Sequence, residues 1–138
     1  LDLEHFSEIK PAGNHVETHV FQLQKTSREF MQKYGCQIES WGPFAEGKNG
    51  LFTNPVLTEI GKKYEKTAAQ TTLRFLLQSD VEDNPKSVHK ERMKQNIDVF
   101  DFTLTAEDMA AIEALDGGES IFFSHYDPKT VEWFMSIL

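Results

Sequence analysis

The stretches PAGNHVETH at residues 11–19 and CQIESW at residues 36–41 determine which fold class this chain can adopt. The first stretch begins at Pro11 and the second follows Gly35, and both residues favour turns. Each stretch mixes apolar with polar positions at a period near two, which is typical of a strand. The residues between them, 25–34, have a helical pattern that Gly35 is suited to close. A strand, a helix and a second strand in this order predict an α/β fold with parallel strands.

The rest of the sequence is mostly helical, and capping residues mark where its helices start. Asn54 precedes a proline at the first helical position, and Thr67 and Thr105 stand where a hydroxyl can accept a hydrogen bond from the first turn. The expected helices cover residues 55–64, 68–78 and 89–100, then a segment from residue 106 that Gly117 and Gly118 end, and a last one that Asp127 and Pro128 begin.

Residues 79–84, SDVEDN, stand where a third parallel strand would be expected. A parallel strand buried on both faces is normally a near-continuous run of Val, Ile and Leu, but only Val81 is apolar here. Burying these carboxylates without partners would be costly or would force their protonation. We therefore expect this segment to be an exposed loop.

Composition limits the classes of function. The chain has 138 residues, 39% of them apolar, which is enough for one domain with a hydrophobic core. Its net charge of −8 argues against a general nucleic-acid binder but allows a local basic pocket. No apolar run approaches the roughly 18 residues of a membrane helix, and the acidic first residues do not resemble a targeting leader. Cys36 is the single cysteine, so we expect a reducing, cytoplasmic location.

Several motifs, in this order, resemble the aldo-keto reductases. PAGNHVETH at residues 11–19 is similar to the sixth barrel strand of that family, and SWGPF at residues 40–44 is similar to the end of its seventh strand. PKSVHKERMKQN at residues 85–96 resembles the family's coenzyme motif, Pro-Lys-Ser followed by Arg and Asn. NIDVFDFTL at residues 96–104 is similar to the stretch that follows it in the family. The likeness covers nearly the whole chain.

The resemblance implies a partial (β/α)8 TIM barrel. The family fold closes eight parallel strands within about 250 residues or more, so 138 residues would hold only its C-terminal half. We expect one partial, helix-rich domain, residues 1–138, with the regions of strands six to eight and the tail, and a barrel that is not closed within this chain. Leu1 fits a start inside the helix after the fifth strand. The family's catalytic Asp, Tyr, Lys and His belong to its first half, and no residue here matches them.

Lys86, Ser87 and Arg92 carry the strongest chemical signal. A ribose 2′-phosphate needs cationic donors, and a planar guanidinium can contact two of its oxygens. A hydroxyl and the free amides of a helix start add further donors. By resemblance, these residues bind the adenine end of NADP(H) together with Val88, Asn96 and Gln95, which stands for the family's Glu. From the residues alone, an ordinary helix start with solvated Lys90, Arg92 and Lys94 stays open as an alternative.

The resemblance assigns the rest of the coenzyme to the strand ends. Trp41 matches the aromatic residue that stacks on the nicotinamide ring, Gly42 stands for a Ser, and Phe44 stands for a Leu near the pyrophosphate. The resemblance also assigns Asn14 to the coenzyme site. His15 replaces the Gln that hydrogen-bonds the nicotinamide carboxamide in the family. An imidazole lacks the paired donor and acceptor of that amide. Trp41 could instead be a core residue at a strand end.

A metal site is the other chemistry that the first strand suggests. His15, Glu17 and His19 share one strand face at period two, which would suit metal ligands. Glu17 and His19 are ordinary residues of the family that bind no metal there, so we expect no metal site. Cys36 has neither a basic neighbour nor a second cysteine, and we expect an inert, buried thiol.

Three functions stay open at this point. The first is the coenzyme-binding part of an NADP(H)-dependent reductase of aldehydes or ketones, inactive alone because its catalytic groups lie elsewhere. The second is a non-catalytic remnant with little or no NADP binding, whose open strand edges make it a homo-oligomer. The third is a regulatory nucleotide-binding module, which would rest on Lys86, Ser87 and Arg92 alone. We expect no nucleic-acid or membrane partner.

Overall fold

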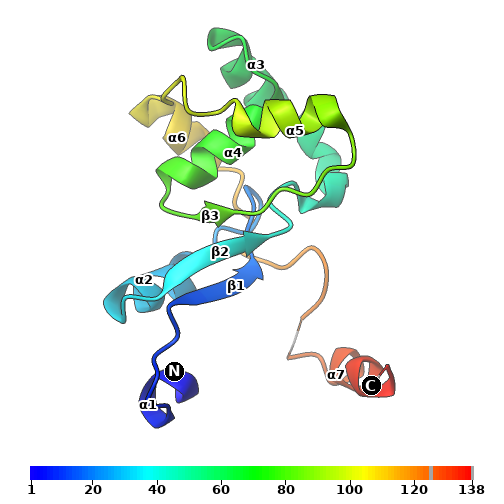
Figure 1. Ribbon diagram of the computed structural model, residues 1–138. Helices are drawn as coiled ribbons and strands as arrows, with labels where there is room; N and C mark the ends of the chain where they lie inside the picture. The colour runs from blue at the N-terminus through cyan, green and yellow to red at the C-terminus, as the bar shows by residue number, and fades with distance from the viewer. Residues whose placement is uncertain (125, 138) are drawn as a thin grey trace.

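The computed structural model describes residues 1–124 and 126–137, and its centre is a three-stranded parallel sheet in the order β1-β2-β3 (Figure 1). β1 (Gly13–Glu17) pairs along its whole length with β2 (Gln37–Trp41), with Gly13 opposite Gln37. α2 (Lys25–Lys33) connects these strands. The predicted parallel strand–helix–strand unit is therefore confirmed, and the sheet is not closed within the described residues.

The helices begin at the capping residues that the sequence predicts. The Asn54 side chain accepts hydrogen bonds from the amides of Val56 and Leu57, and Thr67 and Thr105 each form a capping box. The helices after β2 are the 3₁₀ segment η1 (Ala45–Thr53), α3 (Pro55–Lys63), α4 (Ala68–Gln78), α5 (Lys90–Ile97), α6 (Ala106–Glu113) and α7 (Pro128–Ser136); a short α1 (Asp2–Phe6) precedes β1. α6 ends before the glycines expected to close it.

The prediction that residues 79–84 form an exposed loop is wrong. β3 (Glu82–Asp83) pairs in parallel with β2, with Glu82 opposite Glu39 and Asp83 opposite Ser40. Val81, just before β3, is buried in the core. The pairing uses backbone groups, which every residue supplies, so one buried valine and an exposed Glu82 side chain suffice for a two-residue strand.

Asp83 is the carboxylate whose burial is unfavourable, as the sequence predicts for this segment. Both of its carboxylate oxygens are buried and accept no hydrogen bond from the described residues. Burial favours the neutral acid and raises the pKa of Asp83 to about 8. The strand therefore forms with a carboxyl group that stays protonated near neutral pH.

The core lies between the sheet and the helices that cover one of its faces. α3, α4 and α6 contribute the fully buried Leu57, Phe75 and Ile112, and Figure 1 shows α4 lying over β3. α1 and α7 stand away from this body in Figure 1. Their exposed apolar side chains include Leu3, Phe6, Trp133 and Met135.

Asp83→Asn is expected to reduce the pH dependence of stability. Between the usual carboxyl pKa near 4 and the folded value of about 8, the native state holds a proton that the unfolded chain has released, so stability falls as the pH rises. Urea unfolding at pH 5.5 and pH 8, compared between the unchanged chain and the variant, should assign to Asp83 a fall of about 3 kcal/mol in the free energy of unfolding over this range. The variant should lose most of this difference.

Glu82→Gln is the matched control, because it removes the neighbouring carboxylate from an exposed position of the same strand. It should leave the pH dependence of the unfolding free energy unchanged. If Asp83→Asn and Glu82→Gln showed the same pH dependence as the unchanged chain, the assignment of a buried, protonated Asp83 would be wrong.

Candidate functional site

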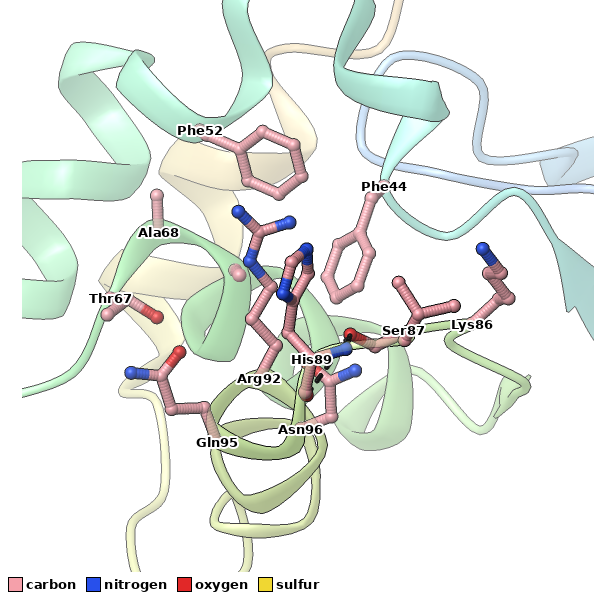
Figure 2. A pocket seen from close by; sticks show the side chains of 12 residues that line it. Phe44, Phe52, Thr67, Ala68, Lys86, Ser87, His89, Arg92, Gln95 and Asn96 are labelled. Atoms are coloured by element: carbon pink, nitrogen blue, oxygen red, sulfur yellow. Dashed lines mark hydrogen bonds between the residues drawn. The ribbon is translucent and has the colours of Figure 1, made fainter.

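A cavity of about 480 Å³ opens where the segments that follow β2 and β3 meet (Figure 2). Parallel strands end at the same edge of a sheet, so the chain leaving β2 toward η1 and the chain leaving β3 toward α5 lie near each other. The first turn of α4 completes the wall. The cavity is lined by Phe44, Phe52, Thr67, Ala68, Ala69, Lys86, Ser87, Val88, His89, Arg92, Gln95 and Asn96.

The polar part of this cavity is suited to an anion. Among the described residues, Lys86 and Arg92 line it and no carboxylate does, although acidic residues outnumber basic ones by 22 to 14 in the whole chain. Ser87 accepts a hydrogen bond at Oγ from the His89 amide at 3.1 Å, just before α5 begins. No side chain caps α5, so its first amides add to the positive potential.

The apolar part of the cavity offers a wall for a flat ring. Phe44 and Phe52 lie with ring centroids 5.6 Å apart and tilted by 53°, and both border the cavity in Figure 2. Ala68 and Ala69, at the start of α4, leave the opposite side free of bulky groups. Cations and aromatic rings that line one cavity are suited to a ligand with both a phosphate and a flat ring.

The structure brings together most of the coenzyme residues that the sequence predicts. Of that set, the cavity is lined by Phe44, Lys86, Ser87, Val88, Arg92, Gln95 and Asn96. Asn14 and His15 are exposed on β1, and they lie outside this cavity together with Trp41 and Gly42. Phe52 and His89 line it but were not predicted. His89 adjoins the Lys-Ser motif, which is a signal that sequence reasoning could have used, whereas nothing local marks Phe52.

The C-terminal segment covers Trp41. The Trp41 ring lies 5.0 Å from Phe122 and is nearly parallel to Phe123, with an interplanar angle of 18° and centroids 6.1 Å apart. Gly42 has a φ of +70°, which few other residues adopt readily, and a Cβ there would touch the Phe122 ring at 3.8 Å. The chain's own aromatic residues therefore pack on the side chain expected to stack on nicotinamide.

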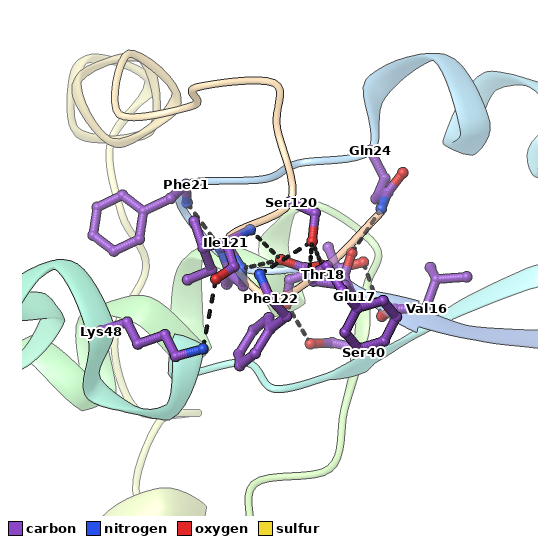
Figure 3. A network of polar contacts seen from close by, with 12 residues as sticks. Val16, Glu17, Thr18, Phe21, Gln24, Ser40, Lys48, Ser120, Ile121 and Phe122 are labelled. Carbon is purple, nitrogen blue, oxygen red and sulfur yellow. Dashed lines mark hydrogen bonds and ion pairs between the residues drawn. The ribbon is translucent and has the colours of Figure 1, made fainter. Parts of the chain in front are cut away.

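A buried polar network holds this segment in place (Figure 3). The Glu17 carboxylate accepts hydrogen bonds from the Ser120 hydroxyl and, at 3.1 Å, from the Ile121 amide. His19 Nε2 lies 2.9 Å from the same carboxylate, and its Nδ1 accepts from the Phe21 amide at 3.2 Å. The network thus places the proton on Nε2, which donates to Glu17. Burial lowers the pKa of His19, against the opposing effect of Glu17.

The network does not assemble a metal site. His15 is exposed, whereas Glu17 and His19 turn to each other and to the C-terminal segment. Within residues 1–124 and 126–137, no group of three or more His, Cys, Asp or Glu side chains is arranged to hold a metal ion. Cys36 is partly buried against the core. In the same ranges, no helix has the length and apolar character needed to cross a membrane.

Comparison with known proteins identifies the class to which this fold and cavity belong. The model of the aldo/keto reductase family matches residues 3–117, and the chain belongs to that family. It is 43% identical over 115 residues to a glyoxal reductase of Bacillus subtilis, which covers 83% of this chain and 41% of the relative. It is 36% identical over 137 residues to a morphine 6-dehydrogenase of Pseudomonas putida.

Solved structures agree with this assignment. An aldo-keto reductase enzyme, MGS-M4, from a Medee basin deep-sea metagenome library superposes with a TM-score of 0.86 at 35% identity, covering 91% of this chain and 46% of that one. A Gox0644 mutant in complex with NADPH superposes with a TM-score of 0.81 at 34% identity, covering 93% and 47%. The chain spans less than half the length of these relatives.

Glu17→Gln is expected to release the C-terminal segment from Trp41. A glutamine presents one acceptor oxygen in place of two, so it can accept from at most two of the three donors around position 17. We expect a loss of about 1–3 kcal/mol in the free energy of unfolding and a red shift of Trp41 fluorescence. The spectra should be recorded in a Trp133→Phe background, which leaves Trp41 as the single tryptophan.

Glu39→Gln provides the control, since Glu39 lies on β2 and its carboxylate makes no hydrogen bond or ion pair with the described residues. It should leave the Trp41 emission maximum unchanged. An unshifted maximum in Glu17→Gln would contradict the role given to the network.

Proposed function

We propose that this chain binds the adenosine 2′-phosphate part of NADP(H) in the 480 Å³ cavity. The whole protein would then be an NADP(H)-dependent oxidoreductase that reduces aldehydes or ketones. Residues 1–138 would form one partial domain corresponding to the C-terminal half of the family fold, with the regions of barrel strands six to eight. The observation that carries the proposal is the cavity itself, which combines Lys86, Ser87 and Arg92 with an aromatic wall.

The residues present fit this part of the coenzyme. The Arg92 guanidinium can donate two parallel hydrogen bonds to a phosphate, and Lys86 adds a compact charge. Phe44 and Phe52 offer aromatic faces to the purine, and the volume falls in the range of roughly 300–1,000 Å³ that small-molecule sites occupy. The NADPH bound to the Gox0644 mutant, with which this chain superposes, supports the same choice of coenzyme.

The chain's own residues would bind and orient the coenzyme. NADPH, when bound, supplies the hydride that adds to the carbonyl carbon. By resemblance, Trp41 would stack on the nicotinamide ring, with Asn14 and His15 at its carboxamide, and this requires Phe122 and Phe123 to move aside. Because Gly42 has no side chain, it would leave room for the pyrophosphate close to the backbone.

We propose that this chain alone does not turn over a carbonyl substrate. Reduction needs a proton donor at the carbonyl oxygen. Tyr64, the tyrosine nearest the core, donates its hydroxyl hydrogen to Asp108 at 2.6 Å, and this bond raises the pKa of Tyr64. It lies outside the cavity. The catalytic Asp, Tyr, Lys and His would come from another part of the protein or from another polypeptide.

A second candidate is a non-catalytic, self-associating remnant with little or no NADP binding. In residues 1–124 and 126–137, β1 pairs with a strand on one side only, which leaves its other edge open. Phe6 on α1 and Trp133 on α7 are 87% and 56% exposed. An open edge and exposed apolar groups favour pairing with a second copy of this chain, a homo-oligomer. For either candidate, the single cysteine favours the cytoplasm.

Arg92→Ala is expected to weaken binding of NADPH by about tenfold or more, because it removes the charged fork that holds the phosphate. Isothermal titration of the chain with NADPH and with NADH measures this, and NADPH should bind more tightly than NADH. Lys94→Ala is the matched control: it removes a cation from the same helix but outside the cavity. It should change the affinity much less.

Equal affinity for NADPH and NADH would contradict the phosphate site. Absence of binding, together with an oligomer in sedimentation velocity, would favour the self-associating remnant instead. Oxidation of NADPH by an aldehyde with this chain alone would contradict the proposal that the catalytic groups lie elsewhere.

A further inference from the structure

His89 lines the cavity and, like Phe52, was not assigned to the coenzyme from the sequence. It stands at the N-cap of α5 and is exposed. Its backbone is fully engaged, with the amide donating to Ser87 Oγ at 3.1 Å and the carbonyl accepting from the Met93 amide at 3.0 Å. Its imidazole makes no hydrogen bond or ion pair with the described residues. The backbone is thus fixed while the ring is free to bind.

The ring points toward the same space as the cations. Figure 2 shows the His89 imidazole and the Arg92 guanidinium projecting into the cavity from the start of α5, with Ser87 and Lys86 on the segment before it. These residues would surround the phosphate if the coenzyme binds as proposed. A protonated imidazole presents two N–H donors to such an oxyanion.

His89 also differs chemically from the cations beside it. Lysine and arginine keep their charge across the physiological range, whereas histidine changes its charge between pH 5 and 8. The charged groups that face it in the cavity are Lys86 and Arg92. The first turn of α4 presents Thr67, Ala68 and Ala69, and η1 presents Phe52, none of which titrates in this range. Within the part of the chain that the structure describes, no carboxylate lines the cavity as a permanent counterion.

We infer that His89 determines how strongly this site prefers a 2′-phosphorylated coenzyme, and that it does so in a pH-dependent way. The inference rests on the proposed function. A phosphate dianion placed among His89, Lys86 and Arg92 favours the imidazolium over the neutral ring, so binding takes up a proton at His89. The affinity for NADP(H) therefore rises as the pH falls toward neutrality, while the affinity for NAD(H), which lacks this phosphate, does not.

The test is a titration of the chain with adenosine 2′,5′-bisphosphate between pH 6.5 and 8.5, with adenosine 5′-monophosphate as the ligand that lacks the 2′-phosphate. The range stays above the second ionisation of a phosphate monoester, near pH 6. The preference for the bisphosphate should increase by about threefold to fivefold from pH 8.5 to pH 6.5, which is what an exposed pair of opposite charges supplies.

His89→Asn should remove this increase. Asparagine is a favoured N-cap residue, so α5 should still form, and its amide does not titrate. Lys90→Gln is the matched control, since it removes a neighbouring cation that does not line the cavity and should leave the pH dependence intact. Circular dichroism of the variants checks that the helices are kept.

The outcomes separate the two proposals. If the bisphosphate binds and its pH dependence is the same in His89→Asn as in the unchanged chain, the role of His89 is wrong and the coenzyme site stands. If the unchanged chain shows no preference for the bisphosphate at any pH, the phosphate site is wrong and the inference fails with it.

Discussion

The parallel pairing of β2 with both neighbours is the constraint on which the rest of the structure depends. Because β1, β2 and β3 run in the same direction, their carboxyl ends lie at one edge of the sheet. The segments that leave β2 and β3 are brought together there, and the cavity forms between them. Without the short pairing of Glu82 and Asp83 with β2, Lys86 and Ser87 would have no fixed position relative to Phe44.

β3 pairs with β2 although burial of its Asp83 side chain is unfavourable. β3 contributes a carboxyl group whose oxygens have no partner in the described chain, and its pKa is raised to about 8 by burial. Val81 and the helix α4 that packs over β3 hold the strand in place. The cation-lined cavity thus lies directly beyond the least favourable strand of the sheet, which links the stability of β3 to the order of the proposed phosphate site.

The two ends of the proposed coenzyme site differ in whether a ligand can enter: the adenine end is open and the nicotinamide end is covered by the chain's own side chains. The adenine end is an open cavity whose lining residues come from η1, α4, α5 and the segment before α5. At the nicotinamide end, Phe122 and Phe123 pack on Trp41, and Glu17 fixes their segment through Ser120 and Ile121. Binding of the adenosine 2′-phosphate end and binding of the nicotinamide end would therefore pose separate demands on this chain, and only the first could be met without rearranging the C-terminal segment.

Local features were predictable from the sequence and long-range ones were not. The helix starts at Asn54, Thr67 and Thr105 were found because capping depends on residues within one turn. β3 was missed because its pairing uses the backbone, which side-chain patterns do not report. The Glu17 network was missed because its partners lie more than a hundred positions away, at Ser120 and Ile121. The family motif located Lys86 and Arg92, whereas Phe52 joined the site only through the tertiary fold.

The most direct test of this account is the pattern of amide chemical-shift changes when ¹⁵N-labelled chain is titrated with adenosine 2′,5′-bisphosphate. The proposed phosphate site predicts changes at residues 86–96 together with Phe44 and Phe52, and the pairing of β2 with β3 predicts slow amide exchange in β2. Changes confined to Asn14, His15 and Trp41, or no changes at all, would contradict it.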